Sequence, residues 1–592
     1  MAQRLDRLHG FVAIWRRLAR NEQVVLSLLA AVIGAAAAYG AIAFRALIGL
    51  VQLGVYGSAS ERLYGFAEGL AWWHVLLAPT VGGLVIGVFV HFVMPGRRNH
   101  GVADVIEAGA LGDSRVGLRA GLGAVAAAAT SIGFGASVGR EGPVVHLGAT
   151  LASWLARRLG FGRSTALTLL GCGVAAAVAA SFNAPIAGVF FALEVVVGHY
   201  ALAAFAPVVI ASVTGSIIAR IHLGDFPAFI VPDYGIVSFL EIPAFLLLGL
   251  ISAAVAGVFM WSTMFAEDCI GRTPLPPWSR PAFGGLAVGA IAVFFPQVLG
   301  VGYEATDLAL KQAFPLWLLI ALGVAKTAAT AVSLGSGFAG GVFSPSLFIG
   351  AMVGGAFGIV AGGAFPELAT SPGAYTIIGM AAVASAVLGA PISTILIVFE
   401  LTGDYGITIA VMIASAVSSV VTQQVPGRSF FHWQLERRGI DIKRDRAASI
   451  LKTITVREVM NETVQRIPRD ISLDDIRELL RLDPHGVFFI VDGDGRLRGS
   501  LTFDDLGAVA FEAGVGNLIN AEDIARSDRT PALAGDSLER ALALMSDNDA
   551  EFLPVIDDAE NRRVIGLVRH KDIIVAHNRA LLDAPTEQGG GL

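Results

Sequence analysis

Residues 133–143 read GFGASVGREGP, and this glycine-rich stretch places a single carboxylate, Glu141, between two long uncharged segments. A carboxylate at membrane depth is costly and usually faces a cavity or a transport pathway. Pro143 favours the first turn of a helix that follows, and the free N–H groups of such a helix start attract anions. Glu141 would therefore compete with an anion for these donors, blocking the site when ionised and releasing it when protonated.

A second stretch of the same form, GVFSP, occupies residues 341–345, and Pro345 lies 202 positions after Pro143. Another pair of segments, NAPIAGVFFALE at 183–194 and GAPISTILIVFE at 389–400, is offset by 206 positions. Two elements repeated at nearly one offset predict two related halves, an arrangement in which transport sites lie at the interface of the repeats. Chance similarity of short apolar stretches is the alternative.

The segments around these motifs are long and apolar. The chain of 592 residues is 55% hydrophobic and 15% charged, whereas soluble domains carry about 25% charged residues. Because a membrane span needs about 20 apolar residues, the recurring uncharged runs predict a polytopic α-helical membrane domain at 23–440, built from two inverted repeats. The runs are Gln23–Phe44, Trp72–Gly96, Ala120–Gly139, Val195–Ala219, Ile242–Ala266, Pro281–Tyr303, Thr327–Phe365, Ala369–Phe399 and Tyr405–Gly427, several of which are long enough to fold back.

Charges outside the apolar part predict its orientation. Five arginines precede the first run, at positions 4, 7, 16, 17 and 20. Positively charged flanks stay cytoplasmic, so we expect residues 1–22 to be a cytoplasmic segment, both termini to be cytoplasmic and the protein to lie in the cell (inner) membrane. Cys172 and Cys269 form no metal motif or disulfide framework.

The C-terminal part is polar and acidic, since residues 451–592 hold 16 basic and 26 acidic side chains, a balance that argues against a nucleic-acid partner. GVFFIVDGDGRLRGSLTFDD at 486–505 and AEFLPVIDDAENRRVIGLVRHKD at 550–572 each read as strand, acidic turn, strand and helix start. Ser472 and Asp536 are expected to begin the preceding helices as caps. We therefore expect two α/β modules. The expected boundaries are a linker at 441–453, modules at 454–510 and 518–578, and a flexible tail at 579–592.

Four segments resemble the CLC family of chloride channels and proton-coupled anion exchangers: GREGP at 139–143, GVFSP at 341–345, FNAPIAGVFFALE at 182–194 and SFFHWQLERRG at 429–439. The acidic modules resemble the CBS domain pair of many members. The resemblance implies a homodimer in the lipid bilayer, with one anion pathway in each subunit and Glu141 as its gate. It also implies anion-binding loops made of Gly139, Arg140, Gly142 and Pro143, and of Gly341, Val342, Phe343, Ser344 and Pro345, with the N–H groups of Val342 and Phe343 at the central anion.

Three positions depart from the family pattern. NHGVAD at 99–104 is the nearest match to the family's serine-containing anion loop and places His100 and Gly101 there. Phe431 stands where the family has a central tyrosine. Val195 stands where exchangers carry a second glutamate for internal proton transfer, as it does in the family's channels. A lone histidine is more often structural than a proton relay, and Glu194 and Glu400 are more simply read as capping or interface carboxylates.

These features predict transport of chloride or a similar small anion in a channel-like or weakly proton-coupled mode. A chloride/proton antiporter on the same scaffold is the alternative, and a non-conducting membrane sensor is the alternative of another class. We find no nucleophile–base pair, metal cluster or phosphate loop of an enzyme in the sequence, and expect no catalytic residue and no required cofactor. Thr502, Asp505 and Asp572 resemble CBS residues that contact the ribose of an adenine nucleotide, although many CBS pairs serve only as dimer contacts.

Overall fold

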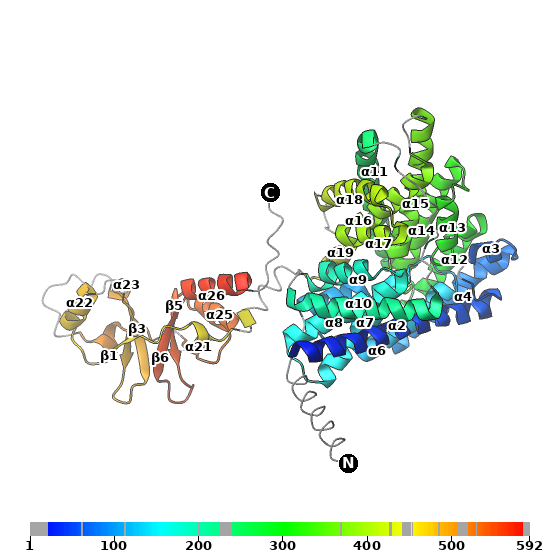
Figure 1. Cartoon of the computed structure of the whole chain (residues 1–592). Coiled ribbons are helices and arrows are strands. Elements are labelled where there is room, and N and C mark those ends of the chain that lie inside the picture. The colour runs from blue at the N-terminus through cyan, green and yellow to red at the C-terminus, as the bar shows by residue number, and fades with distance from the viewer. Residues whose placement is uncertain are drawn as a thin grey trace, which may run out of the picture. The chain divides into compact units, whose positions relative to one another are not determined.

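The computed structural model divides into two compact units, Met1–Ile440 and Asp441–Leu592, and the first is helical whereas the second contains strands (Figure 1). The structure describes residues 22–60, 63–111, 114–198, 202–224, 229, 236, 239–366, 370–424, 429–440, 451–452, 454–482, 486–506, 519–527 and 530–583. The expected N-terminal segment at 1–22 and the expected linker at 441–453 fall largely outside the described residues.

The helical unit holds two series of helices in the same order. The first series is α2 (Glu22–Tyr56), α3 (Leu63–Ala67), α4 (Trp72–Val93), α5 (Val102–Ala110), α6 (Leu118–Gly133), α7 (Glu141–Arg158), α8 (Arg163–Phe182), α9 (Pro185–Phe191) and α10 (Leu202–Leu223). The second is α11 (Ile242–Gly271), α12 (Arg280–Phe294), α13 (Tyr303–Leu310), α14 (Leu316–Ser336), α15 (Phe343–Ala364), α16 (Pro372–Leu388), α17 (Pro391–Thr402) and α18 (Tyr405–Gln424), followed by α19 (Phe430–Arg437). Short turns of other helix types are η1 (Pro95–Arg97), η2 (Ala192–Val197), η3 (Phe239–Glu241) and η4 (Pro296–Val298).

Eight helices among the described residues are long and apolar enough to cross a membrane: α2, α4, α8, α10, α11, α14, α15 and α18. The expected polytopic helical domain is therefore confirmed. Long uncharged runs fold back as expected, because glycines in the left-handed region end helices inside them. Gly337 ends α14 (φ 105°) and Gly389 ends α16 (φ 66°), and each is followed within a few residues by a new helix.

The two series contact each other through equivalent residues. The Glu194 carboxylate accepts hydrogen bonds from the N–H groups of Ile392 and Ser393 at the start of α17 (3.1 and 2.8 Å). The Glu400 carboxylate accepts from Ile186 and Ala187 at the start of α9 (2.9 and 2.8 Å). Each half thus caps a helix of the other half. The capping interpretation of both glutamates is confirmed.

The second unit repeats one α/β pattern twice. Its strands are β1 (Gln465–Pro468), β2 (Phe488–Val491) and β3 (Leu497–Leu501) in one sheet, and β4 (Ala532–Leu533), β5 (Phe552–Ile556) and β6 (Val564–Arg569) in the other. In both sheets the first pair is parallel and the second is an antiparallel hairpin. Its helices are α21 (Val456–Val459), α22 (Leu473–Leu482), α23 (Phe503–Leu506), α24 (Ala521–Ile524), α25 (Leu538–Asp547) and α26 (His570–Asp583). A shared apolar cluster that includes Phe489 and Phe552 packs the two modules together.

One of the two expected helix caps in this unit is wrong. Ser472 accepts from the Asp475 N–H and donates to its carboxylate at 2.6 Å, as expected. At the second helix Ser537 is the cap, because its hydroxyl accepts from the Arg540 N–H. Asp536 lies one residue too early for α25 and accepts from the Leu533 N–H instead (2.8 Å).

Candidate functional site

The two repeated glycine-rich loops pair with each other in the helical unit. The Gly139 N–H donates to the Gly341 carbonyl (2.7 Å) and the Gly341 N–H donates to the Gly139 carbonyl (2.8 Å), which makes an antiparallel bridge. A Cβ atom on Gly142 would lie 3.2 Å from the Gly341 Cα, so the loops touch backbone to backbone. The bridge brings together the starts of α7 and α15, whose first-turn N–H groups lack partners within their own helices. Both helix dipoles favour negative charge at this junction.

Glu141 lies at this junction and is only 2% exposed. Ser344 donates its hydroxyl to the Glu141 Oε2 atom at 2.5 Å, and Tyr303 donates its hydroxyl to the Oε1 atom. Hydrogen bonds from hydroxyls to an ionised carboxylate are stronger than those between neutral groups. Both carboxylate oxygens are therefore held in place by donors from the second half of the unit.

Tyr303 is a functional candidate that the sequence analysis missed. It is the first residue of α13, and its ring lies under the Arg140 guanidinium, 4.7 Å from the Cζ atom to the ring centroid. The Phe229 ring meets it edge-on with the centroids 4.9 Å apart. These contacts fix the ring from two sides, so its hydroxyl is aimed at Glu141. Arg140 thus acts on the glutamate through the tyrosine that both side chains share.

Lys326 is a second candidate that the sequence analysis missed, and its side chain is fully buried in α14. Its Nζ atom donates to the carbonyls of Val298 and Gly300, at 3.0 and 2.9 Å, and lies 5.1 Å from the centroid of the Phe348 ring. Buried polar groups in proteins are normally hydrogen-bonded. Here the two hydrogen bonds fasten the short loop that leads directly into Tyr303.

A cavity of about 760 Å³ reaches Glu141 from one side. Its inner wall includes Gly142, Val342, Phe343, Gly101 and Phe431. Its lining carries six arginines, at positions 97, 98, 272, 280, 437 and 438, and four carboxylates, Asp104, Glu141, Glu267 and Asp268. The formal charge of the lining is therefore positive, and a positive potential in a cleft raises the local concentration of anions.

A second cavity, lined by Arg140, Gly302 and Tyr303, has a volume of about 20 Å³. This volume is close to that of one water molecule. The Glu141–Tyr303 contact joins the lining of the large cavity to that of the small one. Glu141 therefore lies where the large cavity ends.

Two family models match the chain. The model described as "Voltage gated chloride channel" matches residues 82–423, and the model of the CBS domain matches residues 456–508 and 521–578. The chain belongs to the CLC family. It is therefore an integral, multi-pass membrane protein of a chloride-transporting family, with a CBS pair at its C-terminal side.

Relatives and solved structures agree with this assignment to the CLC family. A "Putative chloride channel protein ClcB-like" of Ralstonia nicotianae is 35% identical over 421 residues, which cover 70% of this chain and 98% of the relative. A solved structure titled "slow cyanobacterial Cl-/H+ antiporter" matches with a TM-score of 0.64 at 22% identity, over 70% of this chain and 97% of that chain. The structure of "a eukaryotic CLC transporter" matches 92% of this chain and 97% of its own, with a TM-score of 0.61 at 20% identity.

The structure brings together most of the residues that the CLC resemblance singled out. The GREGP and GVFSP loops meet at Glu141, and Pro345 packs beside Gly139. Phe431, at the first turn of α19, lines the cavity with an apolar ring. Val195 lies apart, in the π-helical turn η2, and is not among the residues that line the large cavity.

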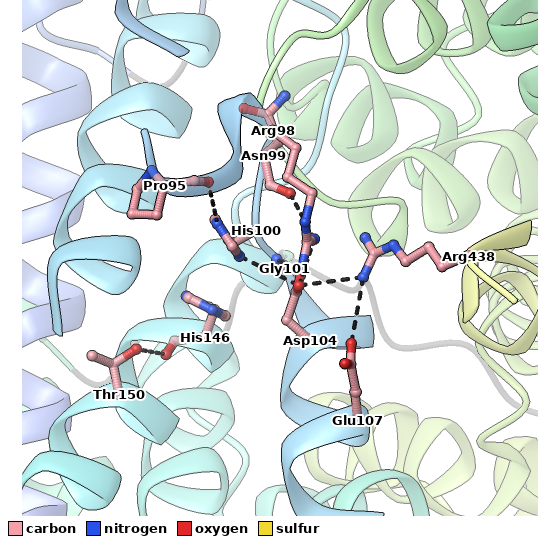
Figure 2. A network of polar contacts seen from close by, with 10 residues as sticks. All are labelled: Pro95, Arg98, Asn99, His100, Gly101, Asp104, Glu107, His146, Thr150 and Arg438. Carbon is pink, nitrogen blue, oxygen red and sulfur yellow. Dashed lines mark hydrogen bonds and ion pairs between the residues drawn. The ribbon is translucent and has the colours of Figure 1, made fainter. Parts of the chain in front are cut away.

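His100 lines the cavity of this CLC protein, but its ring nitrogens face other partners (Figure 2). The Nδ1 atom lies 3.3 Å from the Asp104 Oδ1 atom and the Nε2 atom lies 3.2 Å from the Pro95 carbonyl oxygen. The Gly101 N–H donates to the Asp104 Oδ2 atom at 2.8 Å. Asp104 therefore holds the loop that contains His100 and Gly101.

The three candidate nucleotide residues lie in the CBS unit and bond to neighbours. The Thr502 hydroxyl donates to the Asp505 Oδ2 atom at 2.7 Å, and the Asp505 Oδ1 atom pairs with the Arg526 Nε atom at 3.0 Å. The Asp572 Oδ2 atom accepts from the Arg569 N–H at 3.2 Å. A ribose would have to displace the first of these contacts.

Proposed function

We propose that this CLC protein passes chloride or a similar small anion through the cavity that ends at Glu141, and that Glu141 is the gate of this pathway. The observation that carries the proposal is the position of Glu141. Its carboxylate lies where two bridged loops present two helix starts, at the inner end of an arginine-lined cavity. Backbone and hydroxyl donors suit a partly dehydrated anion, because they replace its hydration shell without binding it too tightly for transport.

Gating follows from competition for these donors. The ionised Glu141 accepts from Tyr303 and Ser344 and places its negative charge where an anion would lie. Protonation removes that charge and leaves one of the carboxyl oxygens as an O–H donor, so one of the two hydroxyl contacts is weakened. The side chain is then released from the junction and an anion can take its place. Transport is therefore expected to rise as the pH falls.

We propose a channel-like or weakly proton-coupled mode. An apolar side chain, Val195, stands at the position of the second proton glutamate and lies away from the cavity lining. The chloride/proton antiporter is the second candidate. The cavity beyond Glu141 has a volume of only about 20 Å³, which favours this mode because an exchanger closes one side of its site at a time.

Simultaneous recording of chloride and proton fluxes in one vesicle preparation separates the two modes. Uphill proton movement driven by a chloride gradient would establish the antiporter, and chloride flux without it would establish the channel-like mode.

A homodimer is expected, with α9 and α17 facing the second copy. Ile186 and Ile392 in these helices are 47% and 42% exposed, and beside them the Glu400 and Glu194 carboxylates are only partly covered. Carboxylates facing lipid are costly, so a second copy that covers this face would stabilise them. We expect two-step photobleaching of singly labelled protein in bilayers, and Ile392→Lys should shift the count towards single steps. One-step bleaching of the wild type at all protein densities would contradict the dimer.

Both termini are proposed to be cytoplasmic, with the protein in the cell (inner) membrane.

No cofactor is proposed for the membrane pathway, whereas an adenine nucleotide is proposed for the CBS pair. The bond between Thr502 and Asp505 positions a hydroxyl and a carboxylate together, as recognition of ribose hydroxyls requires. We expect the full-length protein to bind ATP or AMP in a calorimetric titration and Asp505→Asn to weaken binding about ten-fold, since hydrogen bonds to a charged group contribute about 1.5–3 kcal/mol. Equal affinity in the wild type and this variant would place the nucleotide elsewhere.

A further inference from the structure

Two histidines lie against each other beside the anion loops (Figure 2). The ring centroids of His100 and His146 are 5.9 Å apart, and the ring planes are inclined by 30°. His100 lines the large cavity next to Gly101. His146 belongs to α7, the helix that begins with Glu141, and is fully buried. Neither of its ring nitrogens has a hydrogen-bond partner among the described residues.

The two histidines differ in what surrounds their nitrogens. Both nitrogens of His100 face acceptors, the Asp104 carboxylate and the Pro95 carbonyl. A neutral imidazole has only one N–H, so it would turn a lone pair towards one of these acceptors, whereas the imidazolium ion donates from both nitrogens. The geometry therefore favours a cationic His100. His146 has no acceptor among the described residues to stabilise a positive charge.

We propose that His100 is a protonation-sensitive anion-attracting site on the cavity wall, and that His146 stays neutral beside it so that the pair carries a single positive charge. This inference rests on the proposed function, because it concerns the same pathway. It adds a second pH-dependent element, which acts on entry of the anion and is separate from the Glu141 gate.

The charged groups around His100 balance one another, so a single added proton determines the net charge of the cluster. Asp104 on α5 also pairs with Arg98, at 2.6 Å, and with Arg438, the residue that follows α19, at 3.2 Å. Arg438 reaches Glu107 as well, at 4.0 Å. These two carboxylates and two guanidinium groups balance, so protonation of His100 gives the cluster a net positive charge.

Other titratable groups face the same cavity from neighbouring elements. His91 on α4, Arg97 in η1 and Arg272 after α11 line it together with His100. The arginines stay charged at every pH of interest. Of the two cavity-lining histidines, His100 is the one next to Gly101 in the inner wall. Its charge therefore acts closest to the anion loops.

The direction of the pH effect follows. Histidine is the side chain whose charge ordinarily changes within the physiological pH range. The imidazolium form of His100 raises the anion concentration in the inner cavity and the neutral form does not, so efflux should be faster at acidic than at alkaline pH.

The transport test uses Glu141→Gln as the background, because this substitution removes the gate's own titration. Chloride efflux from vesicles is measured with equal pH on both sides, from about pH 5 to about pH 8, a range that spans histidine titration. We expect several-fold slower efflux at the alkaline end in Glu141→Gln, and a flat profile in Glu141→Gln/His100→Gln. Identical profiles with and without His100 would overturn the proposal.

The charge of His100 is read independently of transport by nitrogen NMR on ¹⁵N-histidine-labelled wild-type protein in bilayers. We expect one imidazolium signal that disappears in His100→Gln and converts to the neutral form as the pH rises, whereas the His146 signals stay neutral. A His100 that is neutral over the whole range, or a His146 that is protonated before it, would refute the assignment. Absence of chloride flux in every variant would instead refute the proposed function, and the NMR result would still decide the charge of the pair.

Discussion

Replacing Glu141 with glutamine is expected to raise anion flux at neutral and alkaline pH by roughly ten-fold and to remove the part of its pH dependence that comes from the gate. The ionised carboxylate accepts two charge-assisted hydrogen bonds, from Tyr303 and Ser344. The amide is neutral, and each of its bonds to these hydroxyls is weaker by about 1 kcal/mol. Glutamine has nearly the same size, so the pathway keeps its shape while the blocking charge is lost. Chloride efflux from vesicles at a series of pH values measures the effect.

Glu241→Gln is the matched control for this experiment. Glu241 is also a buried carboxylate held by hydroxyls, from Thr370 and Tyr375 at 2.5 Å each, but it lines neither the large nor the small cavity. Its flux and pH profile should match those of the wild type. A Glu141→Gln profile that cannot be distinguished from this control would show that the carboxylate at position 141 does not gate transport.

Replacing Tyr303 with phenylalanine is expected to move the pH midpoint of transport upward by about one to two pH units. The phenol hydroxyl stabilises only the ionised, blocking form of Glu141, and a hydrogen bond to a charged group contributes about 1.5–3 kcal/mol. One pH unit corresponds to about 1.4 kcal/mol. Without this donor the ionised, blocking form of the gate is less stable, so the gate opens under more alkaline conditions. The midpoint of the flux–pH curve gives the shift directly.

Tyr56→Phe serves as the control for Tyr303. Tyr56 is a buried tyrosine of the same unit, and its hydroxyl donates to the Phe134 carbonyl at 3.1 Å and not to the gate. We expect it to leave the midpoint unchanged. Ser344→Ala should shift the midpoint in the same direction as Tyr303→Phe. A downward shift in either gate variant would be incompatible with the hydroxyls holding the ionised form.

The sequence was sufficient to predict the two-repeat helical architecture and the position of Glu141. Glycine and proline restrict the local backbone conformation, so the GREGP and GVFSP segments were enough to predict helix starts. Their equal spacing relative to the other repeated pair predicted that the two halves belong together. Neither motif predicts that Gly139 pairs with Gly341, because that contact joins segments about 200 residues apart.

Tyr303 and Lys326 were missed for a related reason. Tyr303 ends one uncharged run and Lys326 directly precedes another, so both marked only the edges of predicted spans. Their roles depend on contacts over long sequence distances, with Glu141 for Tyr303 and with the Val298–Gly300 loop for Lys326. A lysine flanked by uncharged residues on both sides was the available signal, since buried cations in membranes normally have a functional or structural partner.

The contacts of His100 could not be predicted from the family pattern alone. His100 lies on the cavity wall beside Gly101, and its part in anion binding stays a prediction. Its partners could not be predicted, because Pro95, Asp104 and His146 approach it from three different elements of the fold. Only the folded arrangement shows that both ring nitrogens face acceptors.

Chloride efflux from vesicles that contain the wild-type protein or Glu141→Gln, measured across the same pH series, tests the central proposal most directly. The gate mechanism predicts wild-type efflux that rises as the pH falls, and variant efflux that is already high at alkaline pH. Wild-type vesicles that release chloride no faster than protein-free vesicles at every pH would contradict it.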